Sequence, residues 1–288
     1  MENSIIVFRN RPSIRSYAAI AGKKESEGKM GQYFDKIEED AFFGQKNWEQ
    51  AESEMQSQTL NLALEKAGMP LKEIDCITAG DLINQCTVST FAARGTDVPF
   101  LGMYGACSTM AETLLTAGIL TDGGYCQNVA AVTSSHFSTA ERQFRFPLSY
   151  GGQRTPTAQW TCTASGAVVV SAETNSPRLE GGCIGRICDL GVKDATNMGA
   201  AMSPAAADTI YRYLTGTHTQ PEHYDAIVTG DLGNIGSPLL IELLQKQGID
   251  ISAVHQDCGS MMFNEEQQDT HAGGSGCGCS ASILCAYF

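Results

Sequence analysis

A cysteine within a Gly-Ala-Cys-Ser-Thr segment is the side chain in this sequence that is best placed to do chemistry. Cys107 separates an apolar stretch that predicts a strand from a long apolar stretch, Met110 to Leu120, that predicts a helix. The partial positive charge at a helix N-terminus stabilises a thiolate, and small flanking residues let a ligand approach the backbone. The position therefore favours a nucleophile or an anion-binding thiol; a cysteine that only packs in the core is the alternative.

A histidine and a glycine-rich loop in the last part of the chain could complete a site with Cys107. His255 follows Ile249 to Val254, a predicted strand, and could act as a general base or orient a ligand. A core histidine with satisfied hydrogen bonds is the alternative. The loop from Gly273 to Ala281 precedes a predicted helix, so its N–H groups around Gly276 could bind an anion or a developing oxyanion.

The chain contains eleven cysteines, which raises the question of disulfides or a metal. An odd number of cysteines without an export signal favours reduced thiols. Cys277 and Cys279, with Cys258 and Cys285, suggest a zinc site only weakly. Their Cys-x-Cys spacing lacks the usual two-residue spacer, and no second closely spaced pair follows. We expect no metal site.

The segment from Thr133 to Pro147 is dense in hydrogen-bond donors and could form another wall of the site. It contains His136 and two arginines, Arg142 and Arg145, three residues apart. Guanidinium groups at this spacing could hold a carboxylate ligand, because their planar fork matches a carboxylate. A structural ion pair with Glu141 is the alternative.

The charge balance limits the classes of partner. The 288 residues include 19 basic and 32 acidic side chains, which gives a net charge of −13. Nucleic acid is therefore not expected as a partner, and an anionic ligand must be held by local donors. No apolar run is long enough to span a membrane, and residues 1–15 lack the apolar core of a signal peptide.

Helices and strands alternate along the chain, which is typical of an α/β protein built from parallel βαβ units. Residues 1–50 predict irregular structure. Helices are predicted at residues 48–68, 88–94, 110–120, 205–214 and 238–247. Strands are predicted at residues 74–82, 98–104, 128–133, 167–172, 225–231 and 249–254.

An internal repeat relates the two halves of the chain. Residues 75–84 and 225–234 match at six of ten positions with a constant offset of 150, and similar elements follow each segment. Two unrelated strands that end in similar turns are the alternative. The repeat predicts two βαβαβ halves whose central strands end at Asp81 and Asp231, with a site between them.

The predicted halves differ in length. The N-terminal half spans residues 1–190 and the C-terminal half residues 191–288. By symmetry with residues 110–172, the rest of a helix and two strands would follow Phe288. We therefore expect the second half to lack its C-terminal elements.

Nearly the whole chain, from about residue 20, resembles the stage V sporulation protein AD family. The motifs that carry the resemblance are Asn47-Trp48-Glu49, Gly80 to Gln85, Gly105 to Thr109, Thr139 to Pro147, Gly151-Gly152-Gln153, Ala205 to Ile210, Thr229 to Leu232, Asp257-Cys258-Gly259 and Gly273 to Cys279. The resemblance implies a thiolase-like fold with two pseudo-symmetric halves in α/β/α/β/α layers.

The resemblance also implies a function in binding rather than in condensation. The family belongs to the machinery that moves dipicolinic acid, with calcium, into the developing endospore, and it binds dipicolinate. The implied partners are other stage V sporulation protein A subunits and a second copy in a homodimer. The implied location is peripheral, on the cytoplasmic side of the forespore or spore inner membrane. No cofactor is expected beyond calcium carried with dipicolinate.

The wider thiolase-like class resembles the chain only in part. In ketoacyl synthases with a Cys-His-Asn set, Cys107 corresponds to the acylated nucleophile and His255 to the histidine. The class asparagine falls on Cys277, a weak donor, and losing one good oxyanion donor costs about 10²–10³ in rate. A transferase that handles acyl thioesters with Cys107 and His255 is the alternative function, and a subunit with an assembly role only is a third.

Together these features predict a binding site for a flat dicarboxylate on a catalytically degenerate scaffold. Dipicolinate requires hydrogen-bond donors at both ends and an apolar wall between them. The predicted ligand-binding residues are Cys107, His136, Arg142, His255, Gly276 and Cys277.

Overall fold

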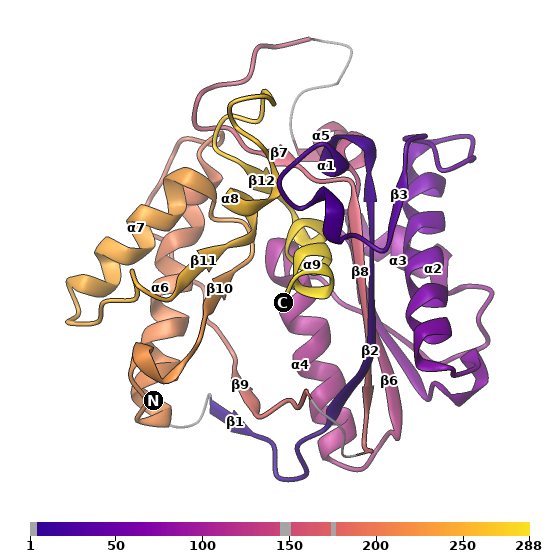
Figure 1. Cartoon of the computed structure of the whole chain (residues 1–288). Helices are drawn as coiled ribbons and strands as arrows, with labels where there is room; N and C mark the ends of the chain where they lie inside the picture. The colour runs from indigo at the N-terminus through magenta and orange to yellow at the C-terminus, as the bar shows by residue number, and fades with distance from the viewer. Residues whose placement is uncertain (1–4, 145–150, 174–176) are drawn as a thin grey trace.

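Helices and sheets stack in five layers in the computed structural model of the chain (Figure 1). The structure describes residues 5–144, 151–173 and 177–288. Two outer layers of helices enclose a large sheet and a small sheet, and further helices lie between the two sheets. This arrangement confirms the α/β class and the α/β/α/β/α order.

The large sheet contains six strands in the order β3-β2-β8-β6-β4-β5. In that order their bounds are Lys36–Glu38, Ser13–Gly22, Ala164–Ser171, Asn128–Ser135, Cys76–Gly80 and Phe100–Gly102. β8 runs antiparallel to β2 and β6, whereas β4 is parallel to β5 and β6. The sheet is therefore mixed, and the prediction of parallel units alone was wrong for this half.

Strand β2 lies within residues 1–50, where the sequence predicted irregular structure, and that prediction was also wrong. Residues 18–21 of this strand are all buried, because helices cover both faces of the sheet. A strand that is buried on both faces shows no alternation of apolar and polar residues. Alanine, which dominates this stretch, is also a weak strand former.

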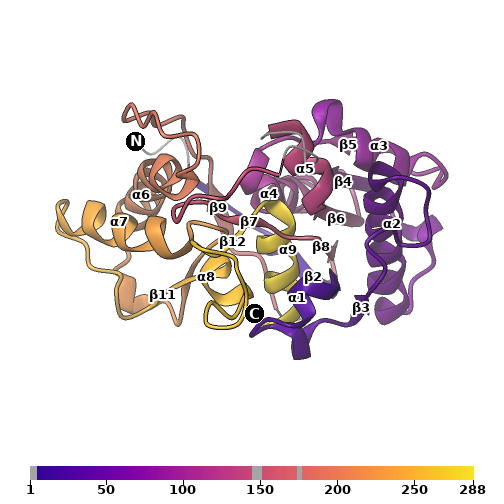
Figure 2. The same cartoon turned by 90° about the horizontal axis from the view of Figure 1, so that it is seen from above.

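Helices cover both faces of the large sheet. The outer face is covered by α2 (Trp48–Ala67) and α3 (Thr87–Ala93). The inner face is covered by α4 (Thr109–Asp122) and by α9 (Cys277–Ala286). Although α9 belongs to the C-terminal half of the sequence, it packs on β8 and β2 (Figure 2). The N-terminal half therefore receives part of its core from the end of the chain.

The C-terminal half repeats the order of elements on a smaller scale. β10 (Ile227–Thr229) and β11 (His255–Asp257) pair in parallel and are joined by α7 (Gly233–Gln245), as α3 joins β4 and β5. Helix α6 (Met198–Thr217) packs against α7 on the outside. β4 ends at Gly80 and β10 at Thr229, within two residues of Asp81 and Asp231, at which the repeat predicted these strands to end.

The strand predicted at residues 249–254 lies elsewhere. β11 begins at His255, after a turn in which the His255 N–H donates to the Ile251 carbonyl at 2.8 Å. Ile251 is fully buried in the cluster between α6 and α7, so the apolar character of this stretch reflects packing. His255 therefore opens a strand, whereas the sequence placed it after one.

Two short strand pairs lie outside the large sheet and the β10–β11 pair, and the second of them connects the halves. β1 (Ile5–Val7) pairs with β9 (Gly181–Cys183) in antiparallel orientation, and β7 (Trp160–Thr161) pairs with β12 (Gly274–Ser275) in parallel. The second pair holds the glycine-rich loop against the N-terminal half just before α9 begins. The remaining α-helices of the described residues are α1 (Lys23–Ser26), α5 (Phe137–Phe144) and α8 (Cys258–Met262).

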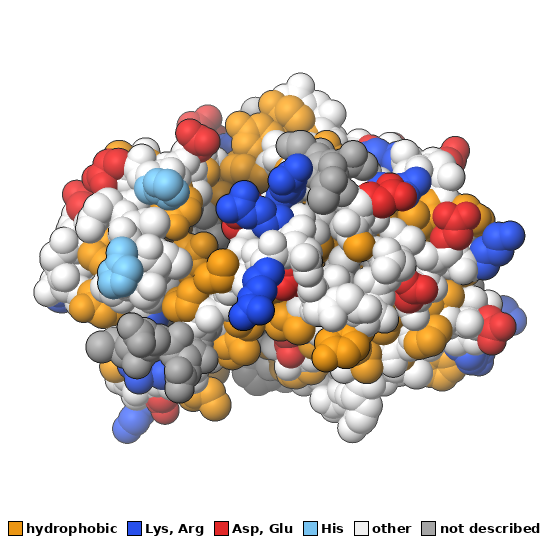
Figure 3. Space-filling model, turned by 90° about the horizontal axis from the view of Figure 1, so that it is seen from below, with side chains coloured by type: hydrophobic (Ala, Val, Ile, Leu, Met, Phe, Trp, Pro, Cys, Tyr) orange, Lys and Arg blue, Asp and Glu red, His pale blue; other side chains and the backbone are white. Residues whose placement is uncertain are grey.

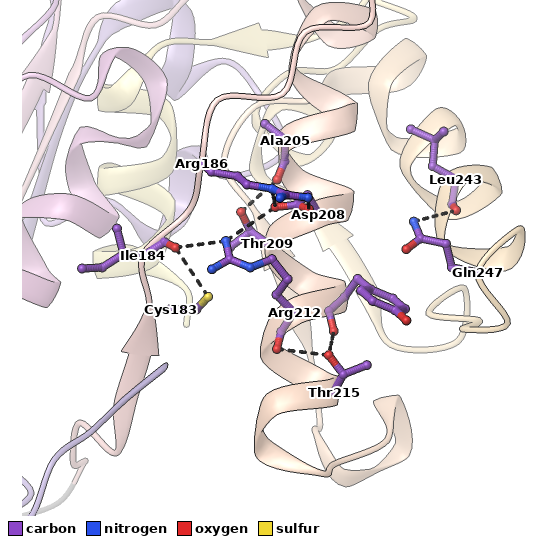
Figure 4. Close-up of polar contacts among 11 residues, drawn as sticks. Cys183, Ile184, Arg186, Ala205, Asp208, Thr209, Arg212, Thr215, Leu243 and Gln247 are labelled. Atoms are coloured by element: carbon purple, nitrogen blue, oxygen red, sulfur yellow. Dashed lines mark hydrogen bonds and ion pairs between the residues drawn. The ribbon is translucent and has the colours of Figure 1, made fainter. Parts of the chain in front are cut away.

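The connection from β9 to α6 contains the predicted boundary between residues 190 and 191. Arg186 donates to both carboxylate oxygens of Asp208 on α6, at 2.9 and 2.6 Å (Figure 4). Arg212 donates to the Ile184 carbonyl at 3.3 Å. These contacts fasten the connection to α6.

The surface is mixed in character. On the face drawn in Figure 3, Lys and Arg side chains near the middle lie among uncharged and hydrophobic side chains, with acidic side chains around them. Exposed hydrophobic side chains at and near β5 include Phe91, Leu101 and Tyr104. In the part of the chain that the structure describes, no helix combines the length and the apolar character needed to cross a bilayer.

Candidate functional site

Cys107 lies in a 3-10 turn, Ala106–Ser108, directly before α4, where the sequence placed it. Thr109 fixes this turn, because its hydroxyl donates to the Ala106 carbonyl at 2.6 Å and accepts from the Gly105 N–H at 3.1 Å. Ala106 has a positive φ of 49°, an uncommon conformation for a residue with a side chain. The residue Cys107 is half-buried as a whole, but its thiol points into the protein.

The environment of this thiol corrects the expectation that the helix N-terminus makes it a thiolate. Burial raises the pKa of Cys107 well above its ordinary value, and the Asp231 carboxylate raises it further. The nearby Gly276 N–H has the opposite and smaller effect on the pKa of Cys107. The thiol is therefore protonated at neutral pH.

Asp231 is the centre of the site, although the sequence marked it only as a strand end. Its side chain is buried, and its Oδ2 accepts from the Gly276 N–H at 2.7 Å and from the Ser275 hydroxyl at 3.4 Å. The Gln159 amide donates to the Asp231 carbonyl at 2.7 Å. Burial raises the pKa of Asp231 to about 6, and the hydrogen bonds from Cys107 and Gly276 limit the rise.

Cys277, the first residue of α9, lies near the Cys107 thiol. It is fully buried, and its thiol donates to the Ser134 carbonyl at 3.1 Å. Burial raises the pKa of Cys277 well above its ordinary value, and the carboxyl groups of Glu52 and Asp81 raise it further. Because this donor is already bonded, it is a poor replacement for an asparagine amide directed at an oxyanion.

His255 is bonded within the C-terminal half. Its Nε2 lies 2.9 Å from the Thr229 hydroxyl, which in turn donates to Asp257 Oδ2 at 2.7 Å. Burial lowers the pKa of His255, so the ring is neutral at neutral pH. Within the described residues, no hydrogen bond joins this ring to Cys107. The nucleophile and base of a condensing site are therefore not paired.

The other two predicted ligand-binding side chains, His136 and Arg142, have partners of their own. The buried His136 ring contacts the Ala41 carbonyl at 2.8 Å through Nε2 and accepts from the Ser138 N–H at 3.1 Å through Nδ1. Arg142 pairs with Glu49 on α2 and lies over the ring of Trp48.

The alternative of an Arg142–Glu141 pair is wrong, because Arg142 pairs with Glu49, whereas Arg154 lies 3.5 Å from Glu141. On a helix, adjacent residues point in different directions, so Arg142 and Glu141 do not face each other. Arg145 lies outside the described residues.

A second buried carboxyl group lies on the other side of Cys277. Glu52 accepts from the Ser134 hydroxyl at 3.0 Å and from the Thr139 hydroxyl at 2.7 Å. Burial, together with the nearby Asp81 carboxyl group, raises the pKa of Glu52 to about 8. Of the buried acids Glu52, Asp81 and Asp231, the sequence marks only the two aspartates, through the duplicated Gly-Asp turn. Glu52 is unmarked, because an acid within a helix is usually exposed.

The arrangement is suited to binding and poorly suited to acyl transfer. The Cys107 thiol is protonated, the His255 ring is neutral and bonded elsewhere, and Cys277 donates to a carbonyl. Among the described residues, no three side chains of the His, Cys, Asp and Glu types converge as a metal site would require. In the glycine-rich loop, the Gly276 N–H donates to Asp231 Oδ2 at 2.7 Å and the Gly278 N–H donates to the Ser135 hydroxyl at 3.2 Å.

Solved structures with a similar fold include OleA and AbyA1. Cerulenin-bound OleA of Xanthomonas campestris matches with a TM-score of 0.65 at 16% identity, over 97% of this chain and 88% of that chain. AbyA1, a tetronic acid condensing enzyme, matches with a TM-score of 0.62 at 14% identity, over 95% and 90% of the two chains. At these identities the likeness shows the fold alone. The chain is a thiolase-like protein.

The sequence then decides the family within this class. The family model of stage V sporulation protein AD matches residues 2–288. The stage V sporulation protein AD of Bacillus subtilis (strain 168) is 43% identical over 277 residues, which cover 96% of this chain and 82% of that protein. The chain belongs to the stage V sporulation protein AD family.

Proposed function

We propose that this sporulation protein binds dipicolinic acid beside Cys107 and does not condense acyl thioesters. The observation that carries the proposal is the burial of the Cys107 thiol near the Asp231 carboxyl group, which accepts from the Gly276 N–H at 2.7 Å. It preserves the position of a condensing enzyme's nucleophile but keeps the thiol protonated, and a protonated thiol is a poor nucleophile. Dipicolinate is the ligand that the family resemblance implies.

The chemistry of the neighbouring groups fits a planar dicarboxylate. The glycine-rich loop offers the Gly276 N–H to one carboxylate in place of Asp231, which accepts from this N–H at 2.7 Å in the ligand-free site. The carboxyl group of Asp231 opposes an anion at the same place. Calcium bound with dipicolinate would offset both negative charges. The net charge of −13 makes this local compensation more important.

Calorimetric titration with dipicolinate, with and without calcium, tests the proposal directly. Cys107→Trp should abolish binding by filling the space beside the loop, whereas the nearly isosteric Cys107→Ser should retain most of it. Isophthalate, which lacks the ring nitrogen, is the matched ligand control. Loss of binding in Cys107→Ser, together with a stable acyl-enzyme in the wild type by mass spectrometry, would show an enzyme instead.

We further propose a peripheral membrane location, with other stage V sporulation protein A subunits as partners and a homodimer as the assembly. The location proposed is the cytoplasmic side of the forespore or spore inner membrane. The support for a homodimer is the outer edge of β5, which is the last strand of the large sheet and carries exposed apolar side chains. Co-purification from sporulating cells, with and without salt extraction of the membrane, tests the location and partners.

A further inference from the structure

The N–H group of Gly276 is already occupied in the ligand-free site. It donates to Asp231 Oδ2 at 2.7 Å, near Cys107. An anionic ligand beside Cys107 would require this same N–H group, because the loop leads into the N-terminus of α9. The buried Asp231 carboxylate and such a ligand therefore compete for one donor.

The repeat explains why Asp231 is available for this role. In the N-terminal half, Asp81 stabilises its own turn by accepting from the N–H groups of Ile83 and Ser89, each at 2.8 Å. In the C-terminal half, the corresponding turn after β10 is held instead by Asp257. Its carboxylate accepts from the N–H groups of Leu232 and Gly233, each at 2.8 Å.

Asp231 is therefore not needed for the turn that it occupies, and its carboxyl group accepts from Ser275 and Gly276 of the glycine-rich loop. We propose that Asp231 is the specificity-determining residue of this site. The ionised Asp231 carboxylate occupies the Gly276 N–H group and repels an anionic ligand. A small dicarboxylate binds when Asp231 is protonated or when a divalent cation accompanies the ligand. This inference rests on the proposed binding function and adds its regulation by pH and calcium.

The groups that face Asp231 support a proton-linked role. They are Cys107 before α4, Asp257 at the end of β11, Cys258 on α8, Cys162 after β7, and Cys277 and Cys279 on α9. Burial raises the pKa of each of these thiols above its ordinary value, so the thiols are uncharged near neutral pH. The negative charge in this part of the site therefore comes from carboxyl groups. Because the pKa of Asp231 is about 6, its charge changes close to neutral pH.

Calorimetric titration with calcium-free dipicolinate between pH 6 and pH 8 tests the proposal. Ordinary carboxylic acids are ionised throughout this range, so a change in affinity reports on the protein. If only protonated Asp231 admits the ligand, wild-type affinity should fall about 50-fold from pH 6 to pH 8. Asp231→Asn, which stays neutral, should bind about 100-fold more tightly than the wild type at pH 8 and show a flat profile.

Asp250→Asn removes one exposed acidic charge from the same half and should match the wild type. A wild-type affinity that is independent of pH overturns the proposal without any variant. So does a pH dependence that persists in Asp231→Asn. Absence of dipicolinate binding at every pH, with calcium as well as without it, rejects the proposed function and this regulation with it.

Alkylation supplies a readout that needs no ligand. Asp231→Asn should raise the rate at which iodoacetamide labels Cys107 several-fold at pH 8, because the charge that opposes thiolate formation is gone. Peptide mass spectrometry measures this rate. An unchanged rate would overturn the assigned contact. A raised rate without dipicolinate binding supports the contact and places the failure in the proposed ligand.

Discussion

At the residue scale, the environment of a side chain decides its chemistry more than its place in a motif. Cys107 precedes a helix, as an activated thiol does, yet Asp231 and burial keep it protonated. The helix N-terminus contributes a modest stabilisation of a thiolate, whereas removing a thiolate from water costs more. The same reasoning applies to buried acids outside the site.

We predict that the wild-type Cys107 thiol reacts slowly with iodoacetamide at pH 7.5. Its raised pKa leaves a very small thiolate fraction, and only the thiolate is a nucleophile. We expect a rate at least about 10-fold below that of free cysteine. Peptide mass spectrometry after timed labelling measures it, and rapid single-site labelling of Cys107 would contradict the prediction.

A second residue-scale prediction concerns Glu25, whose Oε1 accepts from the Thr163 N–H at 3.0 Å. Burial raises the pKa of this nearly inaccessible carboxyl group from 4.5 to about 7. Between these values the folded state keeps a proton that the unfolded state releases, so stability falls as the pH rises to about 7. Glu25→Gln keeps the acceptor without the charge and should stabilise the protein at pH 8 by on the order of 3 kcal/mol.

Urea denaturation at pH 5 and pH 8 measures this effect. The exposed neighbour variant Glu27→Gln should change little at either pH. Equal stabilities of Glu25→Gln and wild type at pH 8 would show that Glu25 ionises without cost. Glu52, whose pKa is about 8, should leave part of the pH dependence in Glu25→Gln.

At the element scale, the close approach of α9 to β8 joins the two halves of the chain. A Cβ on Gly166 of β8 would lie 2.3 Å from the Ala281 carbonyl oxygen, and a Cβ on Gly278 of α9 would lie 2.3 Å from the Ala164 carbonyl oxygen. The nearest atom at both positions is therefore a backbone carbonyl oxygen, which cannot move aside as a flexible side chain would. The glycines at these two positions allow the helix to lie directly on the strand (Figure 2).

Gly166→Ala should therefore destabilise the protein by about 2–4 kcal/mol, because overpacking against backbone forces the helix and strand apart. Chemical denaturation followed by far-UV circular dichroism gives the value. Gly95→Ala is the matched control, since a Cβ at that position meets no atom within 4 Å. A Gly166→Ala protein as stable as the control would mean that α9 does not pack on β8 as described.

Local signals explain which elements the sequence predicts. Helix α2 was predictable because Asn47 caps its start and Gly68, with a φ of 62°, ends it. The repeat predicted β4 and β10. Strand β2 was not predictable, because burial on both faces removes its periodicity. The candidate site could be predicted only in part, since Cys107, Asp231 and Gly276 come from three distant segments that only the fold brings together.

At the scale of the whole molecule, the large sheet ends at β5, and no strand of the described residues pairs with its outer edge. Exposed apolar side chains accompany this edge: Phe91 is 54% exposed, Leu101 46% and Tyr104 46%. An unpaired strand beside apolar side chains is a surface on which another chain can pair. Two copies of a chain with a net charge of −13 repel each other, so such an interface needs an apolar centre.

We expect the wild type to be a homodimer at micromolar concentration, and Leu101→Lys to shift it to the monomer. A lysine at the centre of an apolar interface brings two like charges together and removes apolar burial, which together cost several kcal/mol across the two-fold axis. Light scattering coupled to size-exclusion chromatography measures the mass of each variant. Tyr125→Lys is the control, because Tyr125 is 80% exposed and lies beyond α4, away from β5. A Leu101→Lys protein that stays dimeric would place the interface elsewhere. A monomeric wild type would contradict the proposed dimer. It would not affect the proposed ligand site, because one chain supplies all of its residues.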